Sequence, residues 1–283
     1  MAYFFIQLSD PQFGMFAAFS GLDEAAIEDF RRRGLQVRPA PKTTGFAEET
    51  ALYEAAIAAV NRLKPDFVVT TGDLVNDPTD NAQVAELRRI TDTLDGAIPM
   101  RWAAGNADVC NAPTPGSLAR YRERFGEDNY FFDHRGSRFI VLNSSVYFDP
   151  SNVPDEWKTQ QDFLTGTLKE ARAAGSQHIV VFAHHPLFVQ HPDEEDFFAV
   201  IPKERRLVVL ELLKSYEVSV YFAGHWHRNN YAADGDFQMV TSGSVGYPLG
   251  DDSSGLRIVK VYDDRIEHEY FAFDGLPDTV ELD

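Results

Sequence analysis

The sequence predicts an α/β fold in a single domain that spans residues 1–283. Two patterns support this prediction. Short apolar runs rich in Val, Ile and Phe alternate with longer segments whose apolar residues recur at helical spacing. The last three apolar runs follow one another with no helical segment between them, which predicts an antiparallel portion near the end of the chain. No internal repeat, low-complexity run or linker divides the sequence.

Nine short runs have the composition of buried strands. They are rich in β-branched and aromatic residues and are bounded by turn-forming residues. The expected strands are Tyr3–Ser9, Asp66–Thr71, Pro99–Ala104, Arg138–Asn143, His178–Ala183, Val218–Ala223, Phe237–Thr241, Leu256–Tyr262 and Arg265–Phe273.

Helices are expected between several of these strands, because their apolar residues fall on one helical face. The expected helices are Thr50–Leu63, Gln83–Leu94, Asp155–Ala173 and Lys203–Ser215. Residues 14–45 form the least regular stretch, with a short helix expected over Asp23–Arg33 and a proline-rich turn after it. We interpret this stretch as an insertion that forms a rim or lid near a functional site.

The overall charge restricts the possible partners. The formal net charge is -18, which repels nucleic acid and anionic membranes, so we expect neither as a partner. Cys110 is the single cysteine and no run approaches the ~18 apolar residues of a membrane span. The first apolar run has no basic leader and is interpreted as a buried strand, not as a signal peptide. We therefore expect a cytoplasmic protein.

Polar residues that can bind metal ions follow five of the expected strands. Ligands of open α/β sheets gather at the carboxyl ends of strands, so these five positions predict one common site. The residues are Asp10, Asp73, Asn106, His184 and the pair His225 and His227.

Carboxylate, amide and imidazole groups together suit Zn²⁺, Mn²⁺ or Fe, and the absence of a cysteine cluster argues against a closed structural zinc site. Each position alone has an ordinary structural explanation, such as a turn, a helix cap or a buried histidine. The set is harder to explain without a metal, because buried carboxylates and imidazoles carry a large desolvation cost.

These motifs resemble those of the calcineurin-like metallophosphoesterases. The order Asp-x-x, Gly-Asp, Gly-Asn, His, Gly-His-x-His covers residues 10–227. Further stretches are similar to the small group known as complete serine/threonine protein phosphatases: SDPQFG (9–14), GDLV (72–75), GNADVCNAPTPGSL (105–118), VLNS (141–144), HPLF (185–188), GHWHRN (224–229) and GLRIV (255–259).

The resemblance implies a four-layer fold of two facing mixed β-sheets flanked by helices. It implies two divalent or trivalent metal ions, with Mn, Fe and Zn as candidates, and a water activated between them. Asp73 would bind both ions. The resemblance assigns Asp10 and His227 to the first ion and Asn106, His184 and His225 to the second, and it assigns catalytic roles to Asn106, Asp108 and His184.

Two positions depart from the family pattern. Gln12 stands where the first motif usually has histidine, and its carbonyl oxygen would be a weaker ligand for Zn²⁺ or Fe. Ala107 stands where the third motif has a histidine that protonates the leaving oxygen, so Asp108 lacks the partner it would orient. His185, or His191 further along, is a candidate substitute, and each is alternatively a packing or rim histidine.

Asn143 is a further candidate for supporting the metal ligands, with strand-end hydrogen bonding as the simpler explanation.

The expected function is hydrolysis of phosphate esters, as a phosphomonoesterase or a serine/threonine protein phosphatase acting on a small phosphorylated molecule or a phosphoprotein. One alternative is a phosphodiesterase acting on a nucleotide or lipid head group. A second alternative is a metal-binding scaffold whose activity is weak or lost because of Ala107. The sequence does not predict the oligomeric state.

Overall fold

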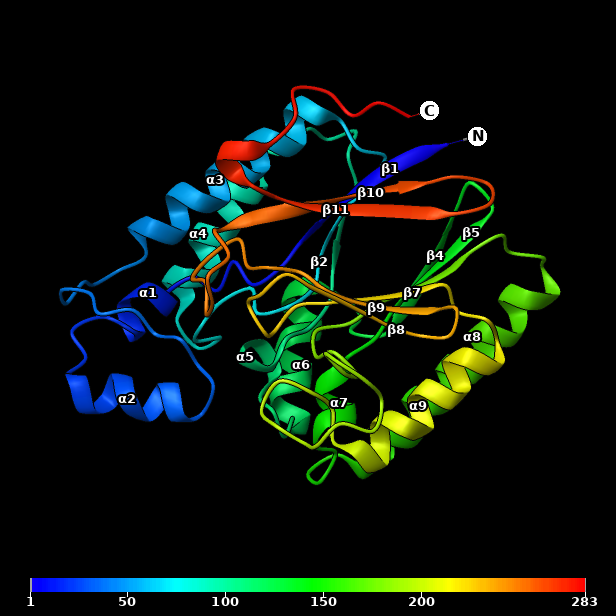
Figure 1. Cartoon of the computed structure of the whole chain (residues 1–283), viewed down its shortest axis with the longest axis horizontal. Helices are drawn as coiled ribbons and strands as arrows, with labels where there is room; N and C mark the ends of the chain where they lie inside the picture. The colour runs from blue at the N-terminus through cyan, green and yellow to red at the C-terminus, as the bar shows by residue number, and fades with distance from the viewer. Residues whose placement is uncertain (1, 283) are drawn as a thin grey trace.

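The computed structural model describes residues 2–282 as two mixed β-sheets that face each other, with helices on both outer surfaces (Figure 1). The first sheet has the strand order β11 (Ile266–Ala272), β10 (Gly255–Val261), β1 (Tyr3–Leu8), β2 (Val68–Thr70), β3 (Met100–Trp102). The second has the order β4 (Tyr130–His134), β5 (Ser137–Val141), β6 (Ile179–Phe182), β7 (Val220–Ala223), β9 (Phe237–Thr241), β8 (Asn230–Asp234).

Parallel strands form the centre of both sheets. In the first sheet β1, β2 and β3 are parallel, and β10 pairs antiparallel with both β1 and β11. In the second sheet β5, β6, β7 and β9 are parallel, and the edge strands β4 and β8 are antiparallel to their neighbours. The carboxyl ends of the parallel strands within a sheet therefore lie at one edge of that sheet.

The four layers are held together by three apolar clusters. Phe5 of β1 contacts Phe139, Phe182 and Phe222 of the second sheet at ring separations of 5.5 to 5.9 Å, which defines the core between the sheets. Alternate residues of β1, such as Ile6, face the opposite way, into the cluster beneath the outer helices.

The outer helices fall into two groups. The helices α3 (Ala47–Leu63) and α4 (Asn81–Thr91) cover the first sheet, whereas α8 (Pro154–Ala173) and α9 (Lys203–Ser215) cover the second (Figure 1). Three helices lie in the connections: α5 (Asn106–Val109), α6 (Pro115–Phe125) and α7 (Ser144–Phe148). A 3₁₀ turn, Phe273–Gly275, follows the last strand.

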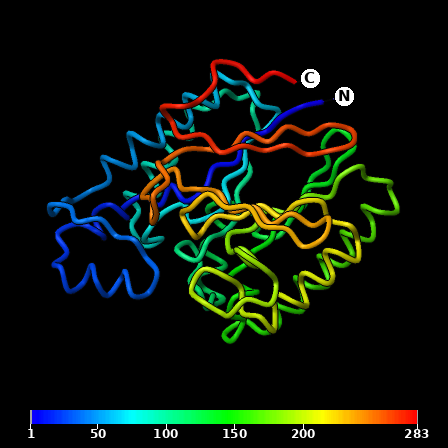
Figure 2. Tube along the Cα trace, in the orientation of Figure 1, coloured from blue at the N-terminus to red at the C-terminus, as the bar shows by residue number. Residues whose placement is uncertain are grey.

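Residues 14–45 contain α1 (Met15–Ala18) and α2 (Glu24–Arg32) and project to one side of the sandwich, as the dark blue trace in Figure 2 shows. A fourth apolar cluster joins this segment to Tyr247 and Leu249, in the loop between β9 and β10. The rings of Phe16 and Phe19 lie 4.9 and 5.5 Å from that of Tyr247. The segment is therefore packed against a loop of the main body.

The α/β class and the two flanked sheets are confirmed, and all nine expected strands are present. The expectation for the last three strands is only partly right. β10 and β11 are antiparallel, but β9 belongs to the other sheet and runs parallel to β7. The sequence analysis missed β4 and β8, both exposed edge strands with alternating burial, and the helices α5 to α7. Within residues 2–282, no helix is both long and apolar enough to cross a membrane.

Candidate metal centre

Five loops meet where strands of both sheets end. Asp10, Asp73 and Asn106 follow β1, β2 and β3 of the first sheet. His184 follows β6 of the second sheet, and the segment from His225 to His227 follows β7. Asp10, Asp73, His184 and His227 are almost completely buried, so the structure gathers the predicted ligand residues into one enclosed cluster.

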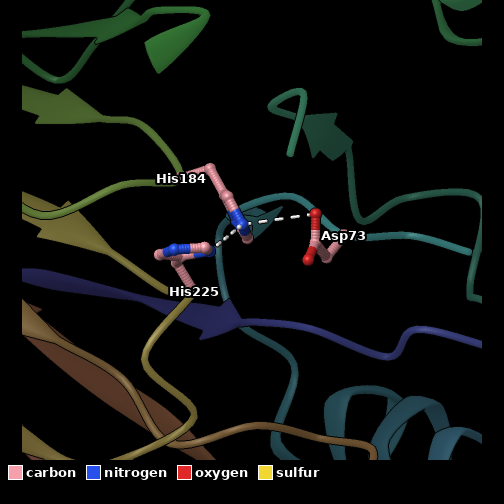
Figure 3. A group of neighbouring side chains, drawn as sticks. All are labelled: Asp73, His184 and His225. Atoms are coloured by element: carbon pink, nitrogen blue, oxygen red, sulfur yellow. Dashed lines mark hydrogen bonds and ion pairs between the residues drawn. The ribbon is translucent and has the colours of Figure 1, made fainter. Parts of the chain in front are cut away.

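The first group of the cluster is centred on His184 (Figure 3). Its Nε2 atom lies 3.2 Å from Asp73 Oδ1, 2.9 Å from Asn106 Oδ1 and 3.1 Å from His225 Nδ1. Four potential ligand atoms thus converge from four loops. In a polyhedron with metal–ligand bonds of about 2.1 Å, neighbouring ligand atoms lie roughly 3.0–3.4 Å apart, so the observed separations suit a bound cation.

The second group consists of Asp10, Asp73 and His227, whose ligand atoms all lie within 4.8 Å of one another. Asp10 Oδ1 lies 3.2 Å from His227 Nε2. Asp73 belongs to both groups. A single carboxylate shared by two clusters is the arrangement that a dinuclear centre requires.

Backbone carbonyl groups fix the orientation of all three imidazoles. Nδ1 of His184 donates to the Thr71 carbonyl (2.8 Å), and Nδ1 of His227 donates to the Tyr247 carbonyl. Nε2 of His225 donates to the Phe198 carbonyl (3.1 Å). In each ring the other nitrogen faces the cluster, which is the orientation that metal-binding histidines need.

The loops that carry these residues adopt strained backbone conformations. Asp10, Gln12, Asp73, His225 and His227 all have positive φ, between 35° and 68°. Such values are uncommon for residues other than glycine and cluster at functional sites.

Two glycines make the close approach of these loops possible. Gly72 has φ of +91°, and a Cβ there would lie 2.7 Å from the Gly105 backbone. A Cβ at Gly224 would overlap Ser9 Oγ.

The buried charges shift one another's pKa values. Burial alone would raise the pKa of Asp10, but the adjacent His227 and His184 lower it to about 2. For His184, burial opposes protonation, yet Asp73 and Asp10 raise its pKa to about 9. Burial and the His184 charge lower the pKa of His225 to about 4. Without a cation, the cluster therefore retains a proton on His184 at neutral pH.

The residues present fit a pair of metal ions. Three imidazole nitrogens, two carboxylates and the Asn106 amide oxygen face one another. Gln12 Oε1 is buried and has no hydrogen-bond partner within the described structure, while its Nε2 donates to Asn76 Oδ1 (3.3 Å). An unpartnered buried oxygen in the loop after Asp10 is consistent with the expected weak ligand.

Asp108 does not orient a side chain of the third motif. Its Oδ1 accepts hydrogen bonds from the backbone amides of Leu74 (3.0 Å) and Val75 (3.4 Å), and its Oδ2 accepts from that of Gly105 (2.8 Å). Burial and the Asp73 charge raise its pKa to about 8. The carboxyl group therefore joins the Asp73 loop to the Asn106 loop. The backbone amide of Ala107 donates to Asp73 Oδ1 (2.8 Å).

His185 is fully buried beside the cluster, with its ring 4.3 Å from that of His225 and stacked on Phe148 at 4.8 Å. Ser144 Oγ accepts from the amides of His184 and His185, so its hydroxyl proton is directed to His185 Nδ1 (2.9 Å). The ring proton then lies on Nε2, which is buried without a partner in the described residues. Burial and the two neighbouring histidines hold the pKa of His185 well below its usual range.

The remaining candidates lie outside the cluster. Asn143 is the N-cap of α7, where its Oδ1 accepts from Ser145 N (3.2 Å) and its Nδ2 donates to Asp128 (2.7 Å). His191 is exposed and its Nδ1 lies 3.0 Å from Asp193.

The sequence analysis missed several groups that support the ligands. Ser9 Oγ donates to Asp10 Oδ2 and accepts from Thr71 (2.9 Å), which in turn accepts from Gln7 (3.1 Å). Ser144 and the carbonyl groups of Phe198 and Tyr247 were also missed. Backbone carbonyls leave no signal in residue type, whereas a polar Gln7 inside an apolar strand is a signal that could have been used.

Comparisons with known proteins agree with this geometry. Residues 5–229 match the family described as calcineurin-like phosphoesterase. The chain is 34% identical over 280 residues to the serine/threonine-protein phosphatase CPPED1 of Danio rerio, covering 97% of this chain and 86% of that one. It is also 34% identical to the Homo sapiens protein of the same name, over 97% and 85% of the two chains.

Solved structures share the fold. A dimetal phosphatase from Danio rerio superposes with a TM-score of 0.67 at 16% identity, over 96% of both chains. A purple acid phosphatase from yellow lupin gives a TM-score of 0.65 at 14% identity, over 97% of this chain and 52% of that one. The matched family spans most of this sequence and includes all six predicted ligand positions, so the chain belongs to the calcineurin-like phosphoesterases.

Proposed function

We propose that this protein is a dinuclear phosphomonoesterase that removes phosphate from serine or threonine residues of phosphoproteins. The observation that carries the proposal is Asp73, whose carboxylate is shared by the two ligand groups. Support for the substrate class comes from the curated relatives named serine/threonine-protein phosphatase, which align over 97% of this chain.

The proposal includes the assignment of the ligands. Asp10, Asp73 and His227 would hold one metal ion, and Asp73, Asn106, His184 and His225 the other. When bound, the metal pair supplies Lewis-acid chemistry, polarising phosphoryl oxygens and making water nucleophilic near neutral pH. Gln12, as a neutral carbonyl ligand, favours a harder ion such as Mn²⁺ for the first group over Zn²⁺.

Residues of this chain would orient the phosphoryl group, and the missing acid at Ala107 would limit the rate of hydrolysis. Asn106 Oδ1 and His184 Nε2 lie 2.9 Å apart, so both side chains would lie close to a phosphoryl group bound at this ligand group. Ala107 offers no side-chain proton, so the leaving oxygen takes its proton from water. General acid catalysis contributes about 10²–10⁴-fold in typical enzymes, so we expect slow turnover of esters with poor leaving groups.

The test is hydrolysis of p-nitrophenyl phosphate by metal-stripped protein before and after Mn²⁺ is restored. An Asp73→Asn variant should lose the Mn²⁺-dependent rate, and Asp236→Asn, at an exposed turn outside the cluster, is the matched control. Bis(p-nitrophenyl) phosphate and a phosphoserine peptide should be compared in parallel. Faster turnover of the diester would favour the phosphodiesterase reading, and bound metal without any turnover would favour the scaffold reading.

The cytoplasmic location expected from the sequence stays a prediction.

A further inference from the structure

A groove with a volume of about 690 Å³ lies beside the metal centre, between the end of α2 and the loop of residues 189–198. The residues that line it include Arg32, Arg33, Phe197, Phe198, Trp226 and Arg228. Trp226 stands in the sequence between the predicted ligands His225 and His227, and the Phe198 carbonyl accepts the hydrogen bond from His225. The groove is therefore connected to the metal centre through both of these residues.

One side of the groove is basic. Residues 30–42 contain five of the chain's 26 basic residues and no acidic residue. Arg32 is the last residue of α2 and Arg33 is its C-cap; both pair with the exposed Asp29, at 3.4 and 3.6 Å, and Arg33 also lies 4.7 Å from the centre of the Phe30 ring. Such exposed pairs are weak and easily exchanged for another carboxylate.

Arg228 adds a third positive charge to the groove. Its Nε donates to the Leu249 carbonyl (3.0 Å) and its Nη2 to the Gly34 carbonyl (2.8 Å), both of which are neutral. Its guanidinium group lies 5.1 Å from the centre of the Trp226 ring. Within residues 2–282 no carboxylate forms a hydrogen bond with Arg228, although the charges of Asp251 and Asp252 lie nearby.

Two of the three acidic residues on the opposite side of the groove make hydrogen bonds or an ion pair within the protein. Glu194 accepts hydrogen bonds from the backbone amides of Val189, Gln190 and His191, at 2.9 to 3.3 Å. Asp193 contacts the ring of His191 at 3.0 Å. Glu195 is the remaining exposed carboxylate of this side. Three arginines line the side of the groove formed by α2 and Arg228, and three carboxylates line the loop opposite, so the two sides of the groove carry opposite charges in a chain of net charge -18.

The groove is preformed. The hydrogen bond from Arg228 to Gly34 joins α2 to the ligand loop, and a Cβ at Gly34 would meet the ring of Phe198 at 3.6 Å. The cluster around Tyr247 packs the rest of the 14–45 segment against the loop whose carbonyl orients His227. Binding here would require little reorganisation of the protein.

We propose that this groove binds the polypeptide segment next to the phosphorylated residue and selects segments with an acidic side chain facing Arg32 and Arg33. The inference rests on the proposed phosphatase function. A small phosphorylated molecule would occupy the metal centre alone and leave the groove empty. Apolar surface for an extended peptide comes from Phe197, which is 37% exposed, and from Phe198 and Trp226. The arginines supply the positive charge that would favour an acidic side chain in that peptide.

The test uses the Mn²⁺-loaded protein and three phosphoserine peptides that are identical except for glutamate, alanine or lysine at the positions flanking the phosphoserine. The measured quantity is kcat/KM for each peptide. Wild-type protein should prefer the glutamate peptide over the alanine peptide by about three- to tenfold, the range expected for one or two exposed ion pairs. The Arg32→Ala, Arg33→Ala double variant should lower this ratio to about one. Arg31→Ala is the matched control, because Arg31 lies on the same helix, pairs with Glu28 and is absent from the groove.

A charge-reversed Arg32→Glu, Arg33→Glu variant should invert the preference toward the lysine peptide. Equal rates on the three peptides by wild-type protein, or an unchanged ratio in the double variant, would overturn the proposal. Hydrolysis of p-nitrophenyl phosphate separates the two hypotheses. If this ester is hydrolysed and the peptide ratio is one, only the groove assignment fails, and if Mn²⁺ restores no hydrolysis of any substrate, the phosphatase function itself fails.

Discussion

Replacing Arg206 should loosen the loop that orients His225, although Arg206 touches no predicted ligand. This arginine is fully buried in α9. Its Nε donates to the Pro192 carbonyl (2.7 Å), its Nη2 to the Glu194 carbonyl, and its Nη1 to the Ile201 carbonyl (3.3 Å) and to Asp196 (3.2 Å). The loop that receives these hydrogen bonds contains Phe198, whose carbonyl fixes the orientation of His225.

The size of the effect follows from these contacts. A hydrogen bond to a charged donor contributes about 1.5–3 kcal/mol, and the bonds to Pro192 and Glu194 are both made with backbone carbonyls of the loop. Arg206→Met leaves both carbonyls without a donor and should lower the free energy of unfolding by about 3–4 kcal/mol, since the loop can relax toward water. Arg206→Lys keeps the charge and one donor, so we expect a loss of about 2 kcal/mol.

Two measurements check the reasoning. Urea denaturation of metal-free protein gives the change in stability, and calorimetric titration with Mn²⁺ gives the affinity of the centre. Loss of a group that orients a ligand typically weakens metal binding by about 10–100-fold, and we expect the lower end for both variants. Arg205→Lys is the control, because this neighbour donates to the Tyr147 and Phe148 carbonyls, outside the loop. A stability change below about 1 kcal/mol for Arg206→Met, or an unchanged Mn²⁺ affinity, would refute the idea that Arg206 holds the loop that orients His225.

Three further predictions concern the metal centre. In metal-free protein the pKa values of His184 (about 9) and Asp108 (about 8) are raised, so the stability that these protons confer is lost as pH rises from 6.5 to 9 for His184 and from 3.8 to 8 for Asp108. The gain in Tm on adding Mn²⁺ should therefore be larger at pH 8.5 than at pH 6.5, and a constant gain would contradict this. Gln12→His should raise the affinity for Zn²⁺ in the calorimeter, because it replaces a carbonyl oxygen with imidazole, whereas an unchanged affinity would remove Gln12 from the ligand set. His185→Ala should slow the hydrolysis of p-nitrophenyl phosphate and of phenyl phosphate by the same factor, because a neutral His185 cannot protonate the leaving oxygen. A larger loss of rate on phenyl phosphate, the ester with the poorer leaving group, would show that His185 does act as the acid.

The sequence was most informative where a polar residue ends an apolar run. Asp10, Asp73 and His184 could be assigned to one site because a strand of Val, Ile and Phe precedes each of them and parallel strands end at a common edge. The same rule could not locate β4 or β8. β8 (NYAAD) is an edge strand with the composition of a loop, whereas β4 (YFFDH) begins with three aromatic residues, a strand signal that the sequence analysis did not use.

The sequence could not predict interactions that are made with backbone groups. The sequence analysis left Asp108 without the histidine that it would orient in the family, because Ala107 stands there, yet its oxygens accept hydrogen bonds from the amides of Leu74, Val75 and Gly105. Backbone amides are present at every position other than proline, so no residue type marks the ones that matter. The retention of Asp108 without its histidine has a structural explanation, which is the joining of two ligand loops.

The strain at the centre links metal binding to folding. Five of the nine residues other than glycine with positive φ among residues 2–282 belong to the predicted centre, and each costs about 1 kcal/mol or more. A total of about 5 kcal/mol is comparable with the stability of a whole domain, so contacts between the loops must hold these conformations. Asp10 N donates to the Gly72 carbonyl (3.2 Å), Gln12 N to that of Asp73 (2.9 Å), and His225 N to the Asp10 carboxylate (3.1 Å). Because each ligand loop is bonded to another and Asp73 serves both groups, a cation bound by one group orders ligands of the other. The two metal ions should therefore bind with positive cooperativity, and a variant that weakens one group should weaken both.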